Sequence, residues 1–74
     1  MNLTELKFGQ KAIIERVTDD DLSLKLFEMG LLPGETIMLE NVAPFGDPIA
    51  VLLSESKICI RLQDAGSVQI KPID

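Results

Sequence analysis

The 74-residue chain contains no histidine, tyrosine or tryptophan, and Cys59 is its single cysteine. Catalysis by nucleophiles or by general acids and bases needs a nucleophile, a base or a metal within mutual reach, and imidazole and thiol are the side chains most often used. The sequence also lacks a glycine-rich phosphate loop of the Walker or dinucleotide-binding type. It therefore predicts a protein that is not an enzyme and has no catalytic residue.

Membrane and export signals are also missing. One cysteine excludes an internal disulfide and fits a reducing compartment. No apolar run approaches the roughly 18 residues that a membrane-spanning helix requires, and the N-terminal residues lack the basic and apolar parts of a signal peptide. We expect a cytoplasmic protein without direct membrane insertion.

Positive charge is sparse and scattered along the chain. Twelve acidic and seven basic residues give a formal net charge of −5. Affinity for nucleic-acid phosphates comes first from clustered lysine and arginine, which this sequence does not have. We therefore expect no nucleic-acid partner, whereas a basic surface on a protein partner is compatible with this charge.

Candidate metal ligands are few. A calcium-binding loop that began at Asp19 would need glycine at its sixth position and glutamate at its twelfth, but these positions hold Leu24 and Gly30. The acidic run 19–21 is expected to begin a helix instead, with weak divalent binding as the alternative. Iron and zinc prefer imidazole and thiolate, of which the chain offers only Cys59. No metal site or cofactor is predicted within one copy.

Cys59 is expected on the outer or lateral face of a strand, as an ordinary structural thiol. Lys57 and Arg61 lie on the same face of that strand. They could stabilise a thiolate, so a reactive or partner-facing cysteine is the alternative interpretation.

Hydrophobic periodicity predicts about five short strands and one early helix. The candidate strands are 11–17, 36–42, 49–53, 57–62 and 67–71. A polar connection at 54–56 predicts a hairpin, and 63–66 predicts a single helical turn. Residues 1–74 are expected to form one domain, which hides only about 60 to 65% of the surface of its unfolded form. For a mainly-β chain of this size, a small and strongly bent β-barrel is the predicted architecture, because it buries the edges of the sheet.

The helix is expected between the first and second strands. Apolar residues from Leu22 to Met29 recur at helical spacing, and with Leu24 and Phe27 included they predict that most of the helix surface is buried. Gly30 then stands where a left-handed residue ends a helix.

A second turn follows at once. Pro33 and Gly34 occupy the second and third positions of a type II turn, in which the third residue needs a positive φ. Gly30, Pro33 and Gly34 are therefore assigned as structural turn residues.

The loop between the second and third strands is the segment that the fold explains least. Two prolines bracket an aromatic and an acidic residue, so the loop is preorganised and loses little entropy when it meets a partner. A lone aromatic in a small domain usually folds back onto the core, whereas an exposed Phe45 would anchor another protein. The candidate partner-binding residues are Pro44, Phe45, Gly46, Asp47 and Pro48.

Three segments together resemble the FeoA family of bacterial ferrous iron transport. They are LFEMGLLPG at 26–34, APFGDP at 43–48 and RLQDA at 61–65. The resemblance covers nearly the whole chain, from the Leu3 region to Ile70. It implies an SH3-like β-barrel with a short helix, which acts in the cytoplasm as an accessory of the membrane ferrous iron transporter FeoB. It further implies binding to the cytosolic, GTPase-bearing part of FeoB and modulation of uptake, without an established catalytic activity.

The same resemblance leaves alternatives open. Some family members are described as binding transition metals. The first alternative is therefore a ferrous iron sensor or carrier that binds the metal through carboxylates and Cys59, with the site shared between two copies. A similar domain also forms the C-terminal module of metal-dependent repressors related to the diphtheria toxin repressor, of which this chain would be a free-standing relative. A peptide-binding SH3 role is disfavoured because three phenylalanines are the only aromatics. The oligomeric state stays open.

Overall fold

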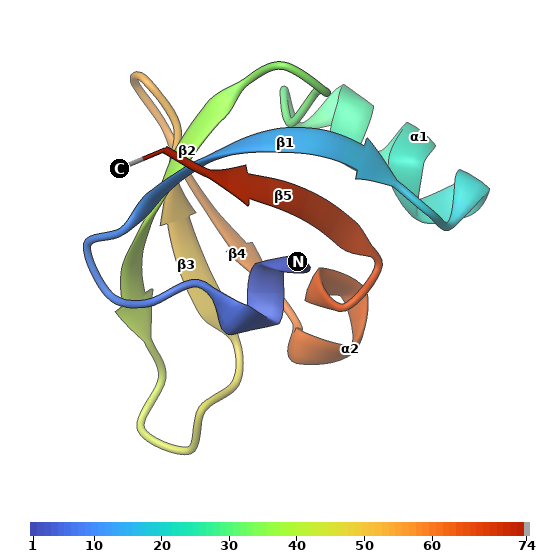
Figure 1. Cartoon of the computed structure of the whole chain (residues 1–74). Coiled ribbons are helices and arrows are strands. Elements are labelled where there is room, and N and C mark those ends of the chain that lie inside the picture. The colour runs from blue at the N-terminus through green and yellow to red at the C-terminus, as the bar shows by residue number, and fades with distance from the viewer. Residues whose placement is uncertain (74) are drawn as a thin grey trace.

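In a computed structural model that describes residues 1–73, the chain forms a five-stranded antiparallel sheet that curls around one core (Figure 1). The strands are β1 (Lys11–Val17), β2 (Thr36–Val42), β3 (Ile49–Leu52), β4 (Lys57–Ile60) and β5 (Val68–Pro72). Their order in the sheet is β4-β3-β2-β1-β5. The predicted mainly-β fold, with one short helix after the first strand, is confirmed.

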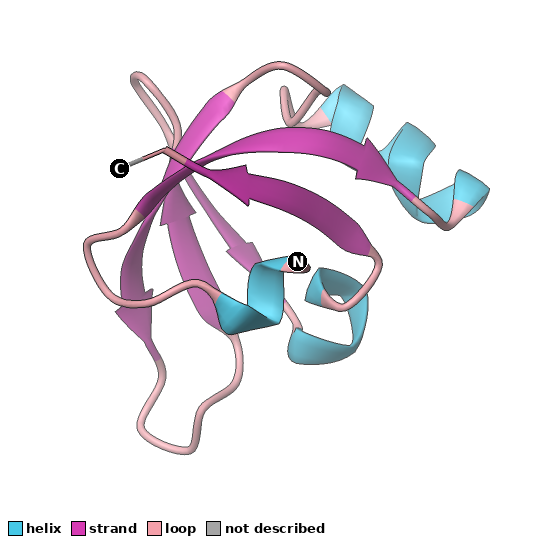
Figure 2. Cartoon of the chain, in the orientation of Figure 1, coloured by secondary structure: helices cyan, strands magenta, loops and turns pink. Residues whose placement is uncertain are grey.

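Three short helical segments flank the sheet within the described residues (Figure 2). They are the 3-10 helix η1 (Leu3–Glu5), α1 (Asp20–Glu28) and α2 (Leu62–Ala65). Helix α2 is the predicted helical turn, begun one residue earlier. Helix η1 was not predicted, although its signal is present: Asn2 caps the Thr4 N–H at 2.9 Å, and the Glu5 carboxylate accepts from the Asn2 N–H at 3.3 Å.

The core is built from aliphatic side chains. Alternate strand residues such as Ile37 and Leu39 of β2 point inward, as expected for an antiparallel sheet with one solvated face. Among the described residues, every fully buried side chain is aliphatic. Phe8, Phe27 and Phe45, the chain's whole aromatic complement, are 76%, 61% and 98% exposed. The aromatic rings therefore belong to the surface.

Helix α1 is buried on one side only. Leu26 is buried and Leu22 packs against the same core, whereas Leu24 and Phe27 are 64% and 61% exposed. The prediction that most of the helix surface is buried is wrong. The helix covers one end of the barrel and has no second element on its outer side among residues 1–73, and apolar spacing alone does not tell which sides of a helix find a partner.

Both ends of α1 are satisfied by local hydrogen bonds. At the start, Asp19 Oδ1 accepts from the Leu22 N–H at 3.1 Å. At the end, the Leu31 N–H donates to the Leu26 carbonyl at 2.8 Å, and the Gly30 N–H donates to the Phe27 carbonyl at 3.0 Å. These two bonds form a Schellman motif, which places Gly30 at φ +90° and brings Leu31 into the core.

The turn that follows leads into β2. The Glu35 N–H donates to the Leu32 carbonyl at 3.0 Å, and Gly34 has φ +94°. These are the features of a type II turn. The Gly34 N–H also donates to the Ile14 carbonyl at 2.8 Å, so the turn is attached to β1. Helix α1 is thus held at the end of the barrel from which β2 starts.

Candidate docking site at the β2–β3 loop

The loop between β2 and β3 is a turn that its own hydrogen bonds close. The Gly46 N–H donates to the Ala43 carbonyl at 2.7 Å, and the Ala43 N–H donates to the Pro48 carbonyl at 3.1 Å. Pro44 and Phe45 therefore occupy the two central positions of a β-turn. Proline presets φ at the first of these, and glycine is common at the fourth position of the turn. The backbone that carries Phe45 has few alternative conformations.

Phe45 stands at the tip of this turn with 98% of its surface exposed. The interpretation in which this ring folds back onto the core is wrong. The turn extends beyond the last paired residues of β2 and β3, Val42 and Ile49, and the core beneath the sheet is already filled by aliphatic side chains. The ring therefore has no apolar neighbour to cover it.

Asp47 connects the loop to helix α2. Its Oδ1 accepts from the Leu62 N–H at 3.0 Å, while Arg61, the residue that precedes α2, makes no capping hydrogen bond with its side chain. Asp47 thus supplies the missing helix cap from another part of the chain. Asp47 was assigned to partner binding, and its side chain forms a hydrogen bond that supports the fold.

Two other exposed apolar side chains lie at the same end of β2 as the loop. Val42 is the last residue of β2 and is 40% exposed. The Gly9 N–H donates to the Leu39 carbonyl at 2.8 Å, which places the neighbouring Phe8 beside the last residues of the same strand. Phe8, Val42 and Phe45 therefore offer apolar surface at one end of the barrel.

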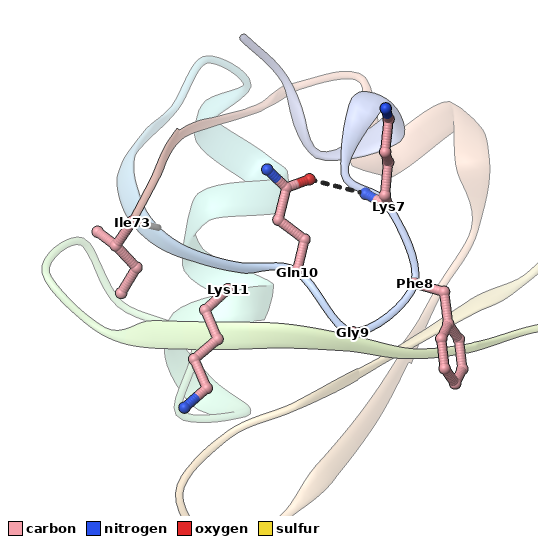
Figure 3. Close-up of a pocket in the computed structure, with 6 residues that line it drawn as sticks. All are labelled: Lys7, Phe8, Gly9, Gln10, Lys11 and Ile73. Atoms are coloured by element: carbon pink, nitrogen blue, oxygen red, sulfur yellow. Dashed lines mark hydrogen bonds between the residues drawn. The ribbon is translucent and has the colours of Figure 1, made fainter.

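A surface groove of about 600 Å³ lies beside Phe8 and is lined by Lys7, Gln10, Lys11 and Ile73 (Figure 3). The Lys7 N–H donates to Gln10 Oε1 at 3.0 Å. Figure 3 shows the two lysine ammonium groups pointing in different directions, and the Phe8 ring turned away from both. The polar groups do not converge on one point, so this groove has no arrangement for holding an anion.

A second groove, of about 520 Å³, lies between the start of β2 and the end of β3, with Met38 and Leu52 among its lining residues. Neither groove includes any residue of the 44–48 loop. Among residues 1–73, no three side chains of the types His, Cys, Asp or Glu gather where they would hold a metal ion. The part of one copy that the structure describes therefore offers no three-ligand set for a resident metal.

Cys59 is a free thiol on an exposed position of β4. The neighbouring cations have carboxylate partners: Lys57 Nζ lies 3.0 Å from Glu40 Oε1, and an Arg61 guanidinium nitrogen lies 3.6 Å from Asp64 Oδ2. The hydrogen bond to Glu40, together with its charge, raises the pKa of Lys57 above the ordinary 10.5. Both cations beside Cys59 are therefore engaged by carboxylates.

A five-stranded antiparallel barrel with a short helix after its first strand defines a small SH3-like β-domain. The chain belongs to the FeoA family, because the family model for the FeoA domain matches residues 1–72. FeoA proteins are accessories of ferrous iron transport. No helix among residues 1–73 has the length and apolar character needed to cross a membrane.

Relatives of known description support this assignment. A Porphyromonas gingivalis protein, described as a fusion of Fe(2+) transport protein A with the Fe(2+) transporter FeoB, is 32% identical over 74 residues, which are 99% of this chain and 9% of that protein. The solution structure of Chlorobium tepidum FeoA has a TM-score of 0.93 at 28% identity and covers 100% of this chain and 71% of that one.

A third relative carries a metal. The crystal structure of Stenotrophomonas maltophilia FeoA complexed with zinc, described as a procaryotic SH3 domain protein, has a TM-score of 0.83 at 28% identity and covers 96% of this chain and 89% of that one. The present chain spans less than a tenth of the curated P. gingivalis relative that it matches.

Proposed function

We propose that this protein docks on the cytosolic, GTPase-bearing part of a FeoB-type ferrous iron transporter and modulates its activity as a non-catalytic cytoplasmic accessory. The observation that carries the proposal is Phe45, an almost fully exposed aromatic side chain on a hydrogen-bonded turn. The P. gingivalis fusion supports the choice of partner. Joining two modules in one chain makes their encounter intramolecular, which is useful when the two act on each other.

Phe45 suits the role of an anchor for energetic reasons. Moving an exposed phenylalanine side chain into an apolar pocket contributes roughly 1.5 to 3 kcal/mol. The backbone that carries the ring is already fixed. Pro44 restricts its φ, and two hydrogen bonds hold it, one between Gly46 and Ala43 and one between Asp47 and Leu62. Little conformational entropy is then lost on docking. One aromatic anchor of this size supports a reversible contact, as regulation of a transporter requires.

A backbone NMR titration tests the proposal. The nitrogen-15-labelled chain is mixed with the cytosolic part of the transporter, with and without a GTP analogue. We expect shifts at the amides of Phe45, Gly46 and Asp47, and an affinity about tenfold or more lower for Phe45→Ser. Glu55→Ser is the control, because Glu55 is also exposed but lies in the turn between β3 and β4, away from the loop that carries Phe45. Unchanged spectra with a GTP-binding partner, or equal affinity of Phe45→Ser and the unmodified chain, would reject it.

A metal-binding role is the second candidate, and the zinc complex of S. maltophilia FeoA is the observation that favours it. Because the described residues of one copy gather no set of three potential ligands, the site would be shared between copies and would use Cys59. Anaerobic calorimetry with ferrous iron and zinc tests this role. Sub-millimolar binding that Cys59→Ser abolishes would establish it, whereas heats that are the same for Cys59→Ser would exclude Cys59.

A further inference from the structure

The negative charge of the chain is concentrated around α1. Residues 18–35 carry five carboxylates and one lysine, a net charge of −4. Residues 1–17 and 36–73 together carry six carboxylates and six cationic side chains, and so are neutral as a group. The net negative charge of the described residues therefore lies in the segment 18–35, at one end of the barrel.

Helix α1 combines this charge with exposed apolar surface. Leu24 and Phe27 are three residues apart, so they are neighbours on the helix surface, and they are 64% and 61% exposed. Asp20 and Glu28, both exposed, lie one turn before and one turn after Leu24 on the same side. We call these four residues, Asp20, Leu24, Phe27 and Glu28, the α1 face. Its centre is apolar and its ends are acidic.

The α1 face is separate from the loop that carries Phe45. Helix α1 and its turn lead into the first residue of β2, Thr36, whereas the loop follows the last residue, Val42. A strand of this length extends over roughly 20 Å. Figure 1 shows α1 and the β2–β3 loop projecting from different ends of the barrel. One small binding surface on a partner would not cover both.

We propose that the α1 face is a second docking surface, and that its occupant is an amphipathic helix of a protein partner whose apolar stripe is flanked by lysine and arginine. The apolar centre supplies area to bury, and the acidic ends pair with cations at the rim of the contact. This inference goes beyond the proposed function, because it does not involve Phe45 and does not require the partner to be the transporter.

Charge decides among the possible occupants. In a dimer through α1, two segments that each carry a net charge of −4 would face each other, which opposes association. An anionic membrane surface repels an acidic helix for the same reason. A basic helix is the occupant for which both the apolar centre and the acidic ends of the α1 face contribute favourably.

The test uses a synthetic amphipathic helix of about 18 residues, long enough to be helical, with a leucine stripe flanked by lysines, and a twin in which glutamate replaces each lysine. Amide spectra of the labelled full chain are recorded with each peptide. We expect the basic peptide to shift resonances of α1, and binding to weaken several-fold between about 50 and 500 mM NaCl.

Two variants separate the apolar and charged contributions. Leu24→Ser with Phe27→Ser removes the apolar centre, and Asp20→Asn with Glu28→Gln removes the charge and keeps the apolar side chains. Asp19 is left intact because it caps the helix. Each double variant should keep the melting temperature of the unmodified chain and lose about tenfold in affinity for the basic peptide. Phe45→Ser should bind this peptide normally, which distinguishes failure of the α1 face from failure of the Phe45 loop.

With the peptides, the proposal would be overturned by equal binding of the basic peptide and its glutamate twin, by shifts confined to residues outside α1, or by retention of full affinity by both double variants. Vesicles of phosphatidylcholine and phosphatidylglycerol are added in a parallel titration. Shifts of α1 with vesicles but not with the basic peptide would assign the surface to a membrane and reject a protein helix. A concentration-dependent dimer that Leu24→Ser with Phe27→Ser abolishes would assign it to a second copy.

Discussion

The carboxylate of Asp47 accepts a hydrogen bond from the backbone N–H of Leu62 at 3.0 Å, so a loop between two strands caps a helix that begins 15 residues later. The same loop presents Phe45 to solvent. Residues 44–48 therefore combine an element that fixes the loop with an exposed side chain that can bind. Stability and the proposed docking can be separated by substitution, because they are assigned to different side chains.

Asp47→Ala should lower the free energy of unfolding by about 1 kcal/mol, the usual effect of losing a helix cap. Urea unfolding monitored by circular dichroism measures the change. Asp47→Asn is the control, since its amide oxygen can still accept from the Leu62 N–H, and it should be close to the unmodified chain. If the two variants are equally destabilised, the carboxylate charge and not the cap is the important property.

Leu26→Ala and Leu24→Ala form a matched pair on one helix. Leu26 is 2% exposed, so its truncation should cost about 3 kcal/mol. For a domain of this size, with a stability of roughly 3 to 5 kcal/mol, that loss leaves a free energy of unfolding of about 0 to 2 kcal/mol, so up to about half of the chain would be unfolded at room temperature. Leu24 is 64% exposed, and its truncation should change the free energy of unfolding by less than about 0.5 kcal/mol. Similar urea midpoints for both variants would contradict the one-sided burial of α1.

This pair also shows what the sequence could and could not predict. The strand at 36–42 was correctly predicted, because apolar residues alternate along it; Ile37 and Leu39 share the side that faces the core, and both are buried. In the helix, Leu22 and Leu26 are four residues apart and share one side, whereas Leu24 points to the opposite side. Which of them is covered depends on the barrel against which the helix packs, and no local pattern contains that information.

The candidate site divides in the same way. The rigid turn at Pro44 to Gly46 could be predicted, because proline and glycine act through their own backbone geometry. The bond between Asp47 and Leu62 could not, because it joins two segments 15 residues apart that only the folded chain brings together. The sequence does contain one indication of this bond. Arg61, directly before the short helix, is not a capping residue, so the cap has to come from elsewhere. The exposure of Phe45 likewise depends on a core that aliphatic side chains have already filled.

Gly30→Ala should cost about 1 kcal/mol, because a side chain other than glycine is strained at φ +90°. A Cβ atom at this position would meet no atom within 4 Å, so the cost comes from the backbone and not from a clash.

Gly66→Ala is the control. Gly66 has φ −62° and its nearest neighbour would be 3.8 Å from an added Cβ, so this variant should be neutral or slightly more stable. Thermal unfolding of both variants measures the difference, and an equal loss at both positions would contradict the left-handed role of Gly30.

Lys57 gives the fold a stability contribution that depends on pH. Its pKa is raised in the folded chain, first by the hydrogen bond to Glu40 and then by the charge of that carboxylate. Because the folded state holds this proton more tightly than the unfolded state, the contribution is complete below pH 10.5 and is lost as the pH rises through the higher pKa of the folded chain. The pair is solvent-exposed, so the contribution is small and decreases with added salt.

The quantity to measure is the difference in urea midpoint between the unmodified chain and Lys57→Gln, from about pH 8 to pH 11.5, which spans the ordinary lysine pKa. We expect a constant advantage of the unmodified chain at the lower end and a shrinking one above pH 10.5. In a Glu40→Gln background the advantage should be absent throughout; if it persists there with the same pH dependence, the stabilisation does not come from the pairing of Lys57 with Glu40.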